Sequence, residues 1–193
     1  MFEVEIKAKV NCNVLSKIKE RINLLNPSKY EKVIYHDVYY DNCSNEYYRN
    51  EKELRLRKIT QGDNTYTNVF TFKDMPFDYA TKSKNEYEVN LSDFSTMNDI
   101  LLKLGFNKDI EFVKECENYY VKFNGKDISI TIAYLPDLKE YFIELEILEV
   151  CVDENINNLK EILSELLSDF SISEQNVTSK YYTDSIREKR KGG

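Results

Sequence analysis

The sequence predicts an α+β protein built on a closed or nearly closed antiparallel β-barrel (a tunnel) of about eight strands, with helices packed outside. The first observation behind this prediction is that charged and apolar residues alternate in many short stretches. In the opening stretch, Glu3, Glu5 and Lys7 fall on one face of a strand and apolar residues fall on the other. The second observation is the Asn124-Gly125 pair between two such stretches, which is a strong hairpin signal.

The first half of the chain follows this pattern from its start. The predicted strands cover residues 1–10, 32–41, 53–60, 66–73 and 84–91. Helices are predicted over residues 11–25 and 93–104, where apolar residues recur at helical spacing. Asn26-Pro27-Ser28 ends the first helix, and Gly105 provides the C-cap of the second.

The second half repeats the plan of strands followed by a helix. The predicted strands cover residues 111–123, 127–134 and 140–150, and the helix covers about 153–168. Nothing in the composition marks a linker, so we expect a single domain over residues 1–186. Residues 187–193, which are rich in Lys and Arg, are predicted to form a solvated basic tail.

The composition excludes several classes of protein. A hydrophobic content of 41% with only 5 Gly and 3 Pro predicts a folded chain. The net charge of −7 argues against general nucleic-acid binding. No stretch approaches the ~18 apolar residues of a membrane span, and the charged opening strand gives no reason to expect a signal peptide. The four scattered cysteines are typical of reduced thiols, so we expect a cytoplasmic protein.

The charged strand faces are predicted to turn inward, because helices can cover the apolar faces from outside. The predicted inward carboxylates are Glu3, Glu5, Glu86, Glu88, Glu144 and Glu146, and the predicted inward bases are Lys7, Arg55, Arg57, Lys73 and Lys180. A cavity with both charges suits a metal–polyphosphate ligand, since carboxylates bind hard divalent cations and bases bind phosphate oxygens. The alternative is an open sheet whose charged faces meet water, and the alternation alone favours neither.

Seven short motifs follow one another along the chain in a recognisable order. They are Glu3-x-Glu5-x-Lys7, His36-Asp37-x-Tyr39-Tyr40-Asp41, Leu54-Arg55-Leu56-Arg57, Thr71-Phe72-Lys73, Glu86-x-Glu88, Glu144-x-Glu146 and Lys180-Tyr181-Tyr182-x-Asp184. Over nearly the whole chain this order resembles the CYTH family, also called triphosphate tunnel metalloenzymes. That family includes class IV adenylyl cyclases, thiamine triphosphatases and inorganic triphosphatases. The stretch 101–106 leans toward the cyclase-like branch.

The resemblance implies a site for Mg²⁺ or Mn²⁺ and for a small-molecule triphosphate or nucleotide. It assigns the metal to Glu3, Glu5, Glu144 and Glu146. It assigns the triphosphate to Lys7, Arg55, Arg57, Lys73, Lys114 and Lys180. It assigns catalysis to Glu3, Glu5, Lys7 and Lys73, supported by Glu86, Glu88 and Tyr39. It also makes a homodimer plausible.

Two positions depart from the family pattern. Cys116 takes the place of a family Arg, for which Lys114 could substitute as a point charge, and Ala133 takes the place of an inward Asp. An Arg restored at position 116 is expected to bind triphosphate more tightly if the missing Arg limits binding.

The predicted function is metal-dependent hydrolysis of a triphosphate, or cyclisation of ATP to cAMP and pyrophosphate. The alternative is a diverged tunnel that binds a nucleotide or polyphosphate as a sensor or sink, without turnover. A purely structural domain is the least favoured interpretation, because so many buried charges need a partner.

Overall fold

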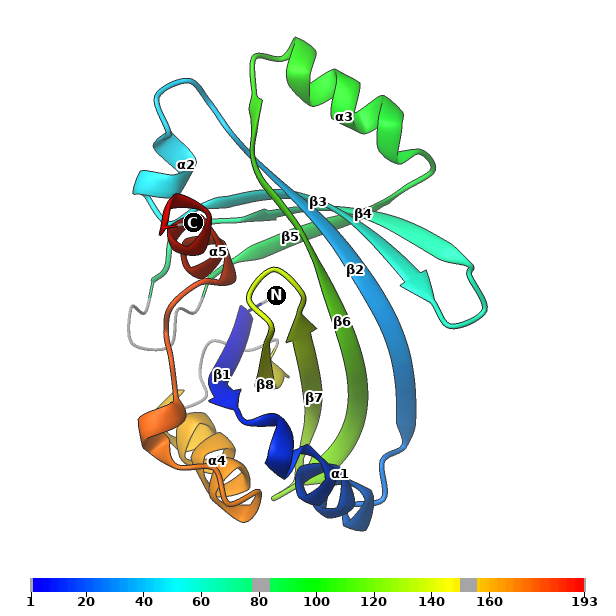
Figure 1. The fold of residues 1–193 in the computed structure, drawn as a ribbon, viewed down its shortest axis with the longest axis vertical. Helices are drawn as coiled ribbons and strands as arrows, with labels where there is room; N and C mark the ends of the chain where they lie inside the picture. Colours follow the sequence, from blue (N-terminus) through cyan, green and yellow to red (C-terminus); the bar gives the residue numbers. More distant parts are fainter. Residues whose placement is uncertain (1, 78–83, 150–155, 193) are drawn as a thin grey trace.

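The computed structural model describes residues 2–77, 84–149 and 156–192 (Figure 1). Its strands are β1 (Phe2–Val10), β2 (Lys29–Asp41), β3 (Glu53–Gln61), β4 (Tyr66–Lys73), β5 (Glu86–Leu91), β6 (Asn107–Phe123), β7 (Lys126–Leu135) and β8 (Glu140–Glu149). Its helices are α1 (Leu15–Leu24), α2 (Glu46–Arg49), α3 (Phe94–Lys103), α4 (Ile156–Asp169) and α5 (Tyr182–Gly192). The predicted α+β class and the sheet of about eight strands are confirmed.

One antiparallel sheet carries all eight strands, in the order β1–β8–β7–β6–β2–β3–β4–β5. The long strands β2 and β6 pair in its centre and connect two halves, one made by β1, β8 and β7 and the other by β3, β4 and β5. Figure 1 shows that these long strands bend, so that the sheet curls and its two halves face each other. Right-handed strand twist accumulating over eight strands produces this kind of curl.

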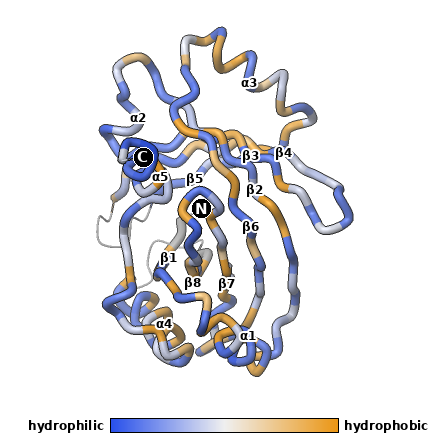
Figure 2. The backbone as a smooth tube through the Cα atoms, viewed as in Figure 1, coloured by the Kyte–Doolittle hydropathy of each residue, from blue (hydrophilic) through white to orange (hydrophobic). Residues whose placement is uncertain are grey.

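Helices cover the apolar outer face of the curled sheet. Ile18 of α1 and Leu163 of α4 are almost fully buried against the half that contains β1 and β8. On the other half, Leu101 of α3 shares a buried cluster with Leu56 of β3. Figure 2 shows hydrophilic and hydrophobic segments alternating along the strands, as expected of a sheet with one polar face. Each fully buried aliphatic side chain contributes roughly 1.5–3 kcal/mol.

The sheet is not closed by hydrogen bonds. Within the part of the chain that the structure describes, the two edge strands β1 and β5 do not pair with each other. The free edge of β1 instead meets the C-terminal segment: the backbone N–H of Thr178 donates to the carbonyl of Lys7 at 2.8 Å, and Ala8 forms a bridge with Val177. The sheet is therefore curled but is not the fully closed barrel that was one form of the prediction. Closure would need the free edge of β1, and the C-terminal segment occupies that edge.

The C-terminal residues that we predicted as a solvated basic tail are helical, and residues 188–192 are exposed. α5 continues from Tyr182 to Gly192, and Ile186 is only 1% exposed. The Lys189 ammonium donates to the carbonyl of Leu138 at 2.9 Å, which fastens the helix to the β7–β8 turn. Figure 1 places α5 on the open side of the curled sheet. No helix within the described ranges is long and apolar enough to cross a membrane.

Candidate functional site

A cavity of about 1140 Å³ lies on the concave face of the sheet. Eleven of the predicted site residues line it: Glu5, Lys7, Tyr39, Arg55, Arg57, Lys73, Glu86, Glu88, Lys114, Glu144 and Glu146. The other two predicted site residues, Lys180 and Glu3, are not in this set. Lys180 is not among the lining residues of the cavity and pairs with Glu188 of α5. The side chain of Glu3 lies outside the described residues, although its backbone belongs to β1.

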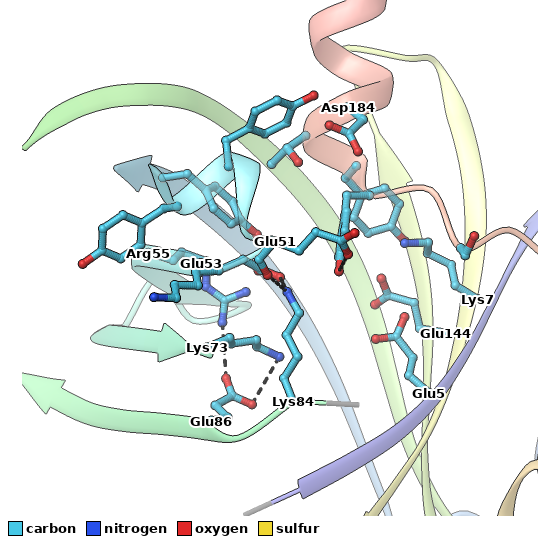
Figure 3. A pocket seen from close by; sticks show the side chains of 18 of the residues that line it. Glu5, Lys7, Glu51, Glu53, Arg55, Lys73, Lys84, Glu86, Glu144 and Asp184 are labelled. Atoms are coloured by element: carbon cyan, nitrogen blue, oxygen red, sulfur yellow. Dashed lines mark hydrogen bonds and ion pairs between the residues drawn. The ribbon is translucent and has the colours of Figure 1, made fainter. Parts of the chain in front are cut away.

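Figure 3 shows two opposed groups of charged side chains. Glu5, Lys7 and Glu144 come from β1 and β8, which form one wall. Arg55 and Lys73 come from β3 and β4, which form the other. These strands are far apart in the sequence, and the curl of the sheet turns their charged faces toward one another. The cavity therefore has carboxylates and bases on both sides.

Glu5 and Glu144 are close enough to influence each other's ionisation. Burial, together with the neighbouring Glu144 carboxylate, raises the pKa of Glu5 above 4.5. Burial opposes ionisation of Glu144 as well, but the Lys114 and Lys7 ammoniums outweigh it and lower the pKa of Glu144. The Lys114 ammonium lies 3.7 Å from the Glu144 carboxylate. Of the two carboxylates, the ionised form of Glu5 is therefore the less stabilised by its surroundings, and a bound cation would stabilise it.

This carboxylate pair fits a divalent cation. Mg²⁺ is usually held by one or two protein carboxylates together with waters and substrate phosphates, rather than by a complete protein cage. No group of three His, Cys, Asp or Glu side chains within the described ranges is arranged to hold a metal alone. Glu5 and Glu144, with Glu146 on the same wall, would therefore hold the ion jointly with a phosphate ligand.

The bases of the opposite wall are preorganised by a shared carboxylate. Lys73 lies 3.2 Å from Glu86, its partner across the β4–β5 ladder, and Arg55 lies 3.9 Å from the same carboxylate. Arg55 is 7% exposed and also donates to the Thr71 hydroxyl at 3.3 Å. Its Nε has no hydrogen-bond partner among the residues that the structure describes. The Arg55 guanidinium is therefore not fully hydrogen-bonded within the part of the chain that the structure describes.

Sequence reasoning missed Lys84. This lysine is 5% exposed, lines the cavity, and lies 2.7 Å from the Glu53 carboxylate of β3. Its ammonium also lies 4.8 Å from the ring of Tyr181. The signal was available, because Lys84 precedes Glu86 by two residues and the two share a face of the strand predicted over residues 84–91.

Arg57 lines the cavity but is held by a second carboxylate that sequence reasoning also missed. Its Nε and Nη2 donate to the two oxygens of Asp37 at 2.6 and 2.8 Å. Asp37 is fully buried, and although burial opposes its ionisation, Arg57 holds its pKa at about 2. Its signal was its place two residues before Tyr39 on β2, because alternate residues share a face.

Asp37→Asn is expected to destabilise the fold by about 3 kcal/mol or more, because it leaves buried Arg57 without its counter-charge. Since the folded-state pKa is below the ordinary 3.8, the contribution of Asp37 is present above pH 3.8 and is lost as the pH falls toward 2. Urea unfolding of the variant and the wild type at pH 7 and pH 3 measures this. A destabilisation of the same size at both values would contradict the ion-pair explanation.

Tyr182 brings the C-terminus into the site. Its ring lies 4.5 Å from the Lys7 ammonium and 5.0 Å from the Lys114 ammonium. It also packs edge-on against Phe142 of β8, with ring centroids 5.0 Å apart. Tyr182 is therefore part of the cavity wall and of the apolar layer beneath it.

The two departures from the family pattern lie side by side. Cys116 of β6 and Ala133 of β7 are cross-strand partners, 1% and 0% exposed. They belong to a buried cluster with Phe142, Tyr182 and Ile186, so α5 covers them. Burial raises the pKa of the Cys116 thiol to about 12, so it is an inert apolar side chain at neutral pH.

The comparisons with known proteins agree with this fold. The family model described as the CYTH domain matches residues 1–182. A Methanocaldococcus jannaschii protein with a provisional adenylate cyclase name is 28% identical over 184 residues, which cover 95% of this chain and 98% of that protein.

Solved structures of other proteins have the same fold. The PH1819 protein of Pyrococcus horikoshii superposes with a TM-score of 0.82 at 27% identity, covering 97% of this chain and 99% of its own. A Hippeastrum protein shares the fold, with a TM-score of 0.66 at 14% identity over 97% and 95% of the two chains. The latter is described as a provisionally assigned adenylyl cyclase with a dominant triphosphatase activity.

Proposed function

We propose a function from one premise: the chain belongs to the CYTH family, whose domain model matches residues 1–182. The protein is a divalent-metal-dependent enzyme that acts on a triphosphate or a nucleoside triphosphate inside the cavity of the curled sheet. The substrate is a small molecule, and Mg²⁺ or Mn²⁺ is the cofactor. The names of its relatives support a cyclase or a triphosphatase.

The observation that carries this proposal is the opposition of the two charged walls. Arg55, Lys73 and Lys84 are mostly buried on one side and Lys7 lies on the other, while Lys114 of the central strand β6 lies 3.7 Å from Glu144. Buried charges are costly unless they are paired or bind a charged ligand. A triphosphate lying between the walls would meet bases on both sides, while Glu5 and Glu144 would face a cation bound to its oxygens.

The side chains act by binding and orienting. The transition state of phosphoryl transfer spreads negative charge over the phosphate oxygens, so preorganised cations supply most of the stabilisation. Glu86 holds Lys73 and Arg55 in place before substrate arrives, which lowers the cost of ordering them. A bound divalent ion would add further charge neutralisation and would lower the pKa of a coordinated water.

The same residues serve both reactions. In hydrolysis, water attacks a phosphorus atom and releases phosphate or pyrophosphate. In cyclisation, the ribose 3′-hydroxyl attacks the α-phosphorus and pyrophosphate leaves. The choice depends on which nucleophile the site places in line with the leaving group.

A second candidate function is binding without turnover, as a sensor or sink. The Cys116–Ala133 pair under α5 favours it, because a family base and carboxylate are replaced there by a closed apolar layer. The two charged walls would still hold a nucleotide.

Phosphorus NMR with Mg²⁺ or Mn²⁺ tests the proposal, with ATP, inorganic triphosphate and thiamine triphosphate supplied separately. Orthophosphate release indicates a hydrolase, and pyrophosphate with a cyclic nucleotide indicates a cyclase. Metal-dependent thermal stabilisation without turnover would select the sensor. If none of the three triphosphates is consumed and none stabilises the protein, both candidate functions fail.

A further inference from the structure

The side of the cavity formed by α2 and α5 contains a stacked pair that the phosphate chemistry does not use. The guanidinium carbon of Arg187 lies 4.5 Å from the ring centre of Tyr48. Asp109 pairs with Arg187 from β6, and Asp184 lies 3.4 Å from its Nη1. Both members of the stack line the cavity that contains the two charged walls. The stack is therefore continuous with the phosphate site.

Tyr48 is held in this place by a buried carboxylate. Asp41, only 3% exposed, accepts hydrogen bonds from the backbone N–H groups of Tyr47 at 3.0 Å and Tyr48 at 2.8 Å. This fixes the start of the short helix α2 relative to β2. Tyr48 nevertheless remains 53% exposed. A preorganised and accessible ring is suited to binding a flat ligand.

The size of the cavity leaves room for such a ligand. Its volume of about 1140 Å³ exceeds the ~300–1,000 Å³ that drug-sized molecules commonly occupy. The bases Arg55 and Lys73 are on strands of the sheet and Lys84 lies just before β5, whereas Tyr48 and Arg187 come from helices on the open side. A bare triphosphate would occupy only the charged part.

We propose that Tyr48 and Arg187 form a base-binding subsite, and that the substrate is a nucleoside triphosphate whose nucleobase stacks on Tyr48. This inference rests on the proposed function and specifies its substrate class. A nucleobase has two π-faces, and aromatic rings and guanidinium planes both bind such faces well. Arg187 covers one side of Tyr48 and would extend the stack to base, ring and guanidinium. Tyr48 is then a specificity-determining residue, and Asp41 positions it.

The test compares ATP with inorganic triphosphate on variants of Tyr48. For each ligand with Mg²⁺, the concentration that gives half-maximal thermal stabilisation is measured, because this readout does not require turnover. Tyr48→Leu removes the ring and keeps apolar bulk, whereas Tyr48→Phe keeps the ring. Tyr66→Leu is the matched control. Tyr66 is 58% exposed and carries the Lys58 ammonium 4.2 Å from its ring, but it does not line the cavity.

Tyr48→Leu is expected to raise the concentration needed for ATP by about tenfold, the loss of one stacked ring, while the value for inorganic triphosphate changes little. Tyr48→Phe should restore ATP to near the wild-type value, and Tyr66→Leu should leave both ligands unchanged. Equal shifts for the two ligands, or no shift for ATP, would overturn the subsite while leaving the proposed function intact. If neither ligand stabilises the wild type, the proposed function and the subsite fail together.

Discussion

Glu5→Gln should reduce metal-dependent turnover of triphosphate by about 100-fold or more, since it removes a charge aimed at the metal–phosphate complex. It should also raise the melting temperature of the metal-free protein at pH 7. Burial and Glu144 raise the pKa of Glu5, so its ionised form is disfavoured in the folded state. An amide has the same shape without that cost. We expect a gain of about 2–4 °C, the shift that 1 kcal/mol produces in a domain of this size.

Glu144→Gln is the matched variant with the opposite expected effect on stability. The pKa of Glu144 is lowered by Lys114 and Lys7 despite its burial, so its charge is favoured in the folded state. Removing that charge leaves the buried Lys114 ammonium without its partner at 3.7 Å. The two carboxylates are both inside one cavity, yet one substitution should stabilise the metal-free protein and the other should destabilise it.

The pH dependence separates these two effects. The stability associated with protonated Glu5 is fully present below the ordinary pKa of 4.5 and is lost as the pH rises through its raised pKa. The advantage of Glu5→Gln should therefore vanish below pH 4.5. The contribution of ionised Glu144 is present above 4.5 and is lost as the pH falls through its lowered pKa, so the deficit of Glu144→Gln should shrink in acid. Wild-type turnover by Glu5→Gln would contradict the assignment of Glu5 to the metal–phosphate site.

Sequence alternation located most of the cavity. A strand places alternate residues on one face, so once Glu5, Arg55 or Glu144 was assigned to the inside, its neighbours two positions away followed. The apolar residues at helical spacing and the apolar strand faces were enough to predict helices over the outside, as α1, α3 and α4 show. Local periodicity carries this information without knowledge of which strands pair.

The features that sequence reasoning missed depend on long-range contacts. The sheet does not close into a barrel because Thr178 of the C-terminal segment hydrogen-bonds to the edge of β1. The alternation of residues along a strand cannot predict this contact. The motif around Lys180 was interpreted through the resemblance, although Tyr182 and Ile186 are four residues apart and share a helix face. Asp37 was overlooked because its importance comes from Arg57 on the neighbouring strand.

Long-range contacts also explain how the protein accommodates the departures from the family pattern at Cys116 and Ala133. These residues are directly paired across β6 and β7, at the positions where the family pattern suggests a base and a carboxylate. Losing both together leaves no unpaired buried charge. Tyr182 and Ile186 of α5 share one buried cluster with both residues, so the two positions and the C-terminal helix pack as one unit.

Cys116→Arg alone is therefore expected to destabilise the protein by about 3 kcal/mol or more, because it places an unpaired charge and a large side chain beneath α5. The sequence alone suggested tighter triphosphate binding, but Cys116 is 1% exposed and shares its buried cluster with Tyr182 and Ile186, so a larger Arg side chain would disturb the packing of α5. Urea unfolding measures the loss. Cys43→Arg, at an exposed cysteine, is the matched control and should unfold like the wild type.

The double variant Cys116→Arg/Ala133→Asp tests whether the pair is the unit that matters. A cross-strand Asp would supply the counter-charge, so the double variant should be more stable than Cys116→Arg by about 1–3 kcal/mol of coupling energy. Ala133→Asp alone should be destabilised, because it buries a carboxylate with no cation opposite. Additive losses in the cycle would show that the two positions act independently. If Cys116→Arg were as stable as the wild type and bound triphosphate more tightly, α5 would have to yield easily, and the evidence favouring a sensor without turnover would disappear.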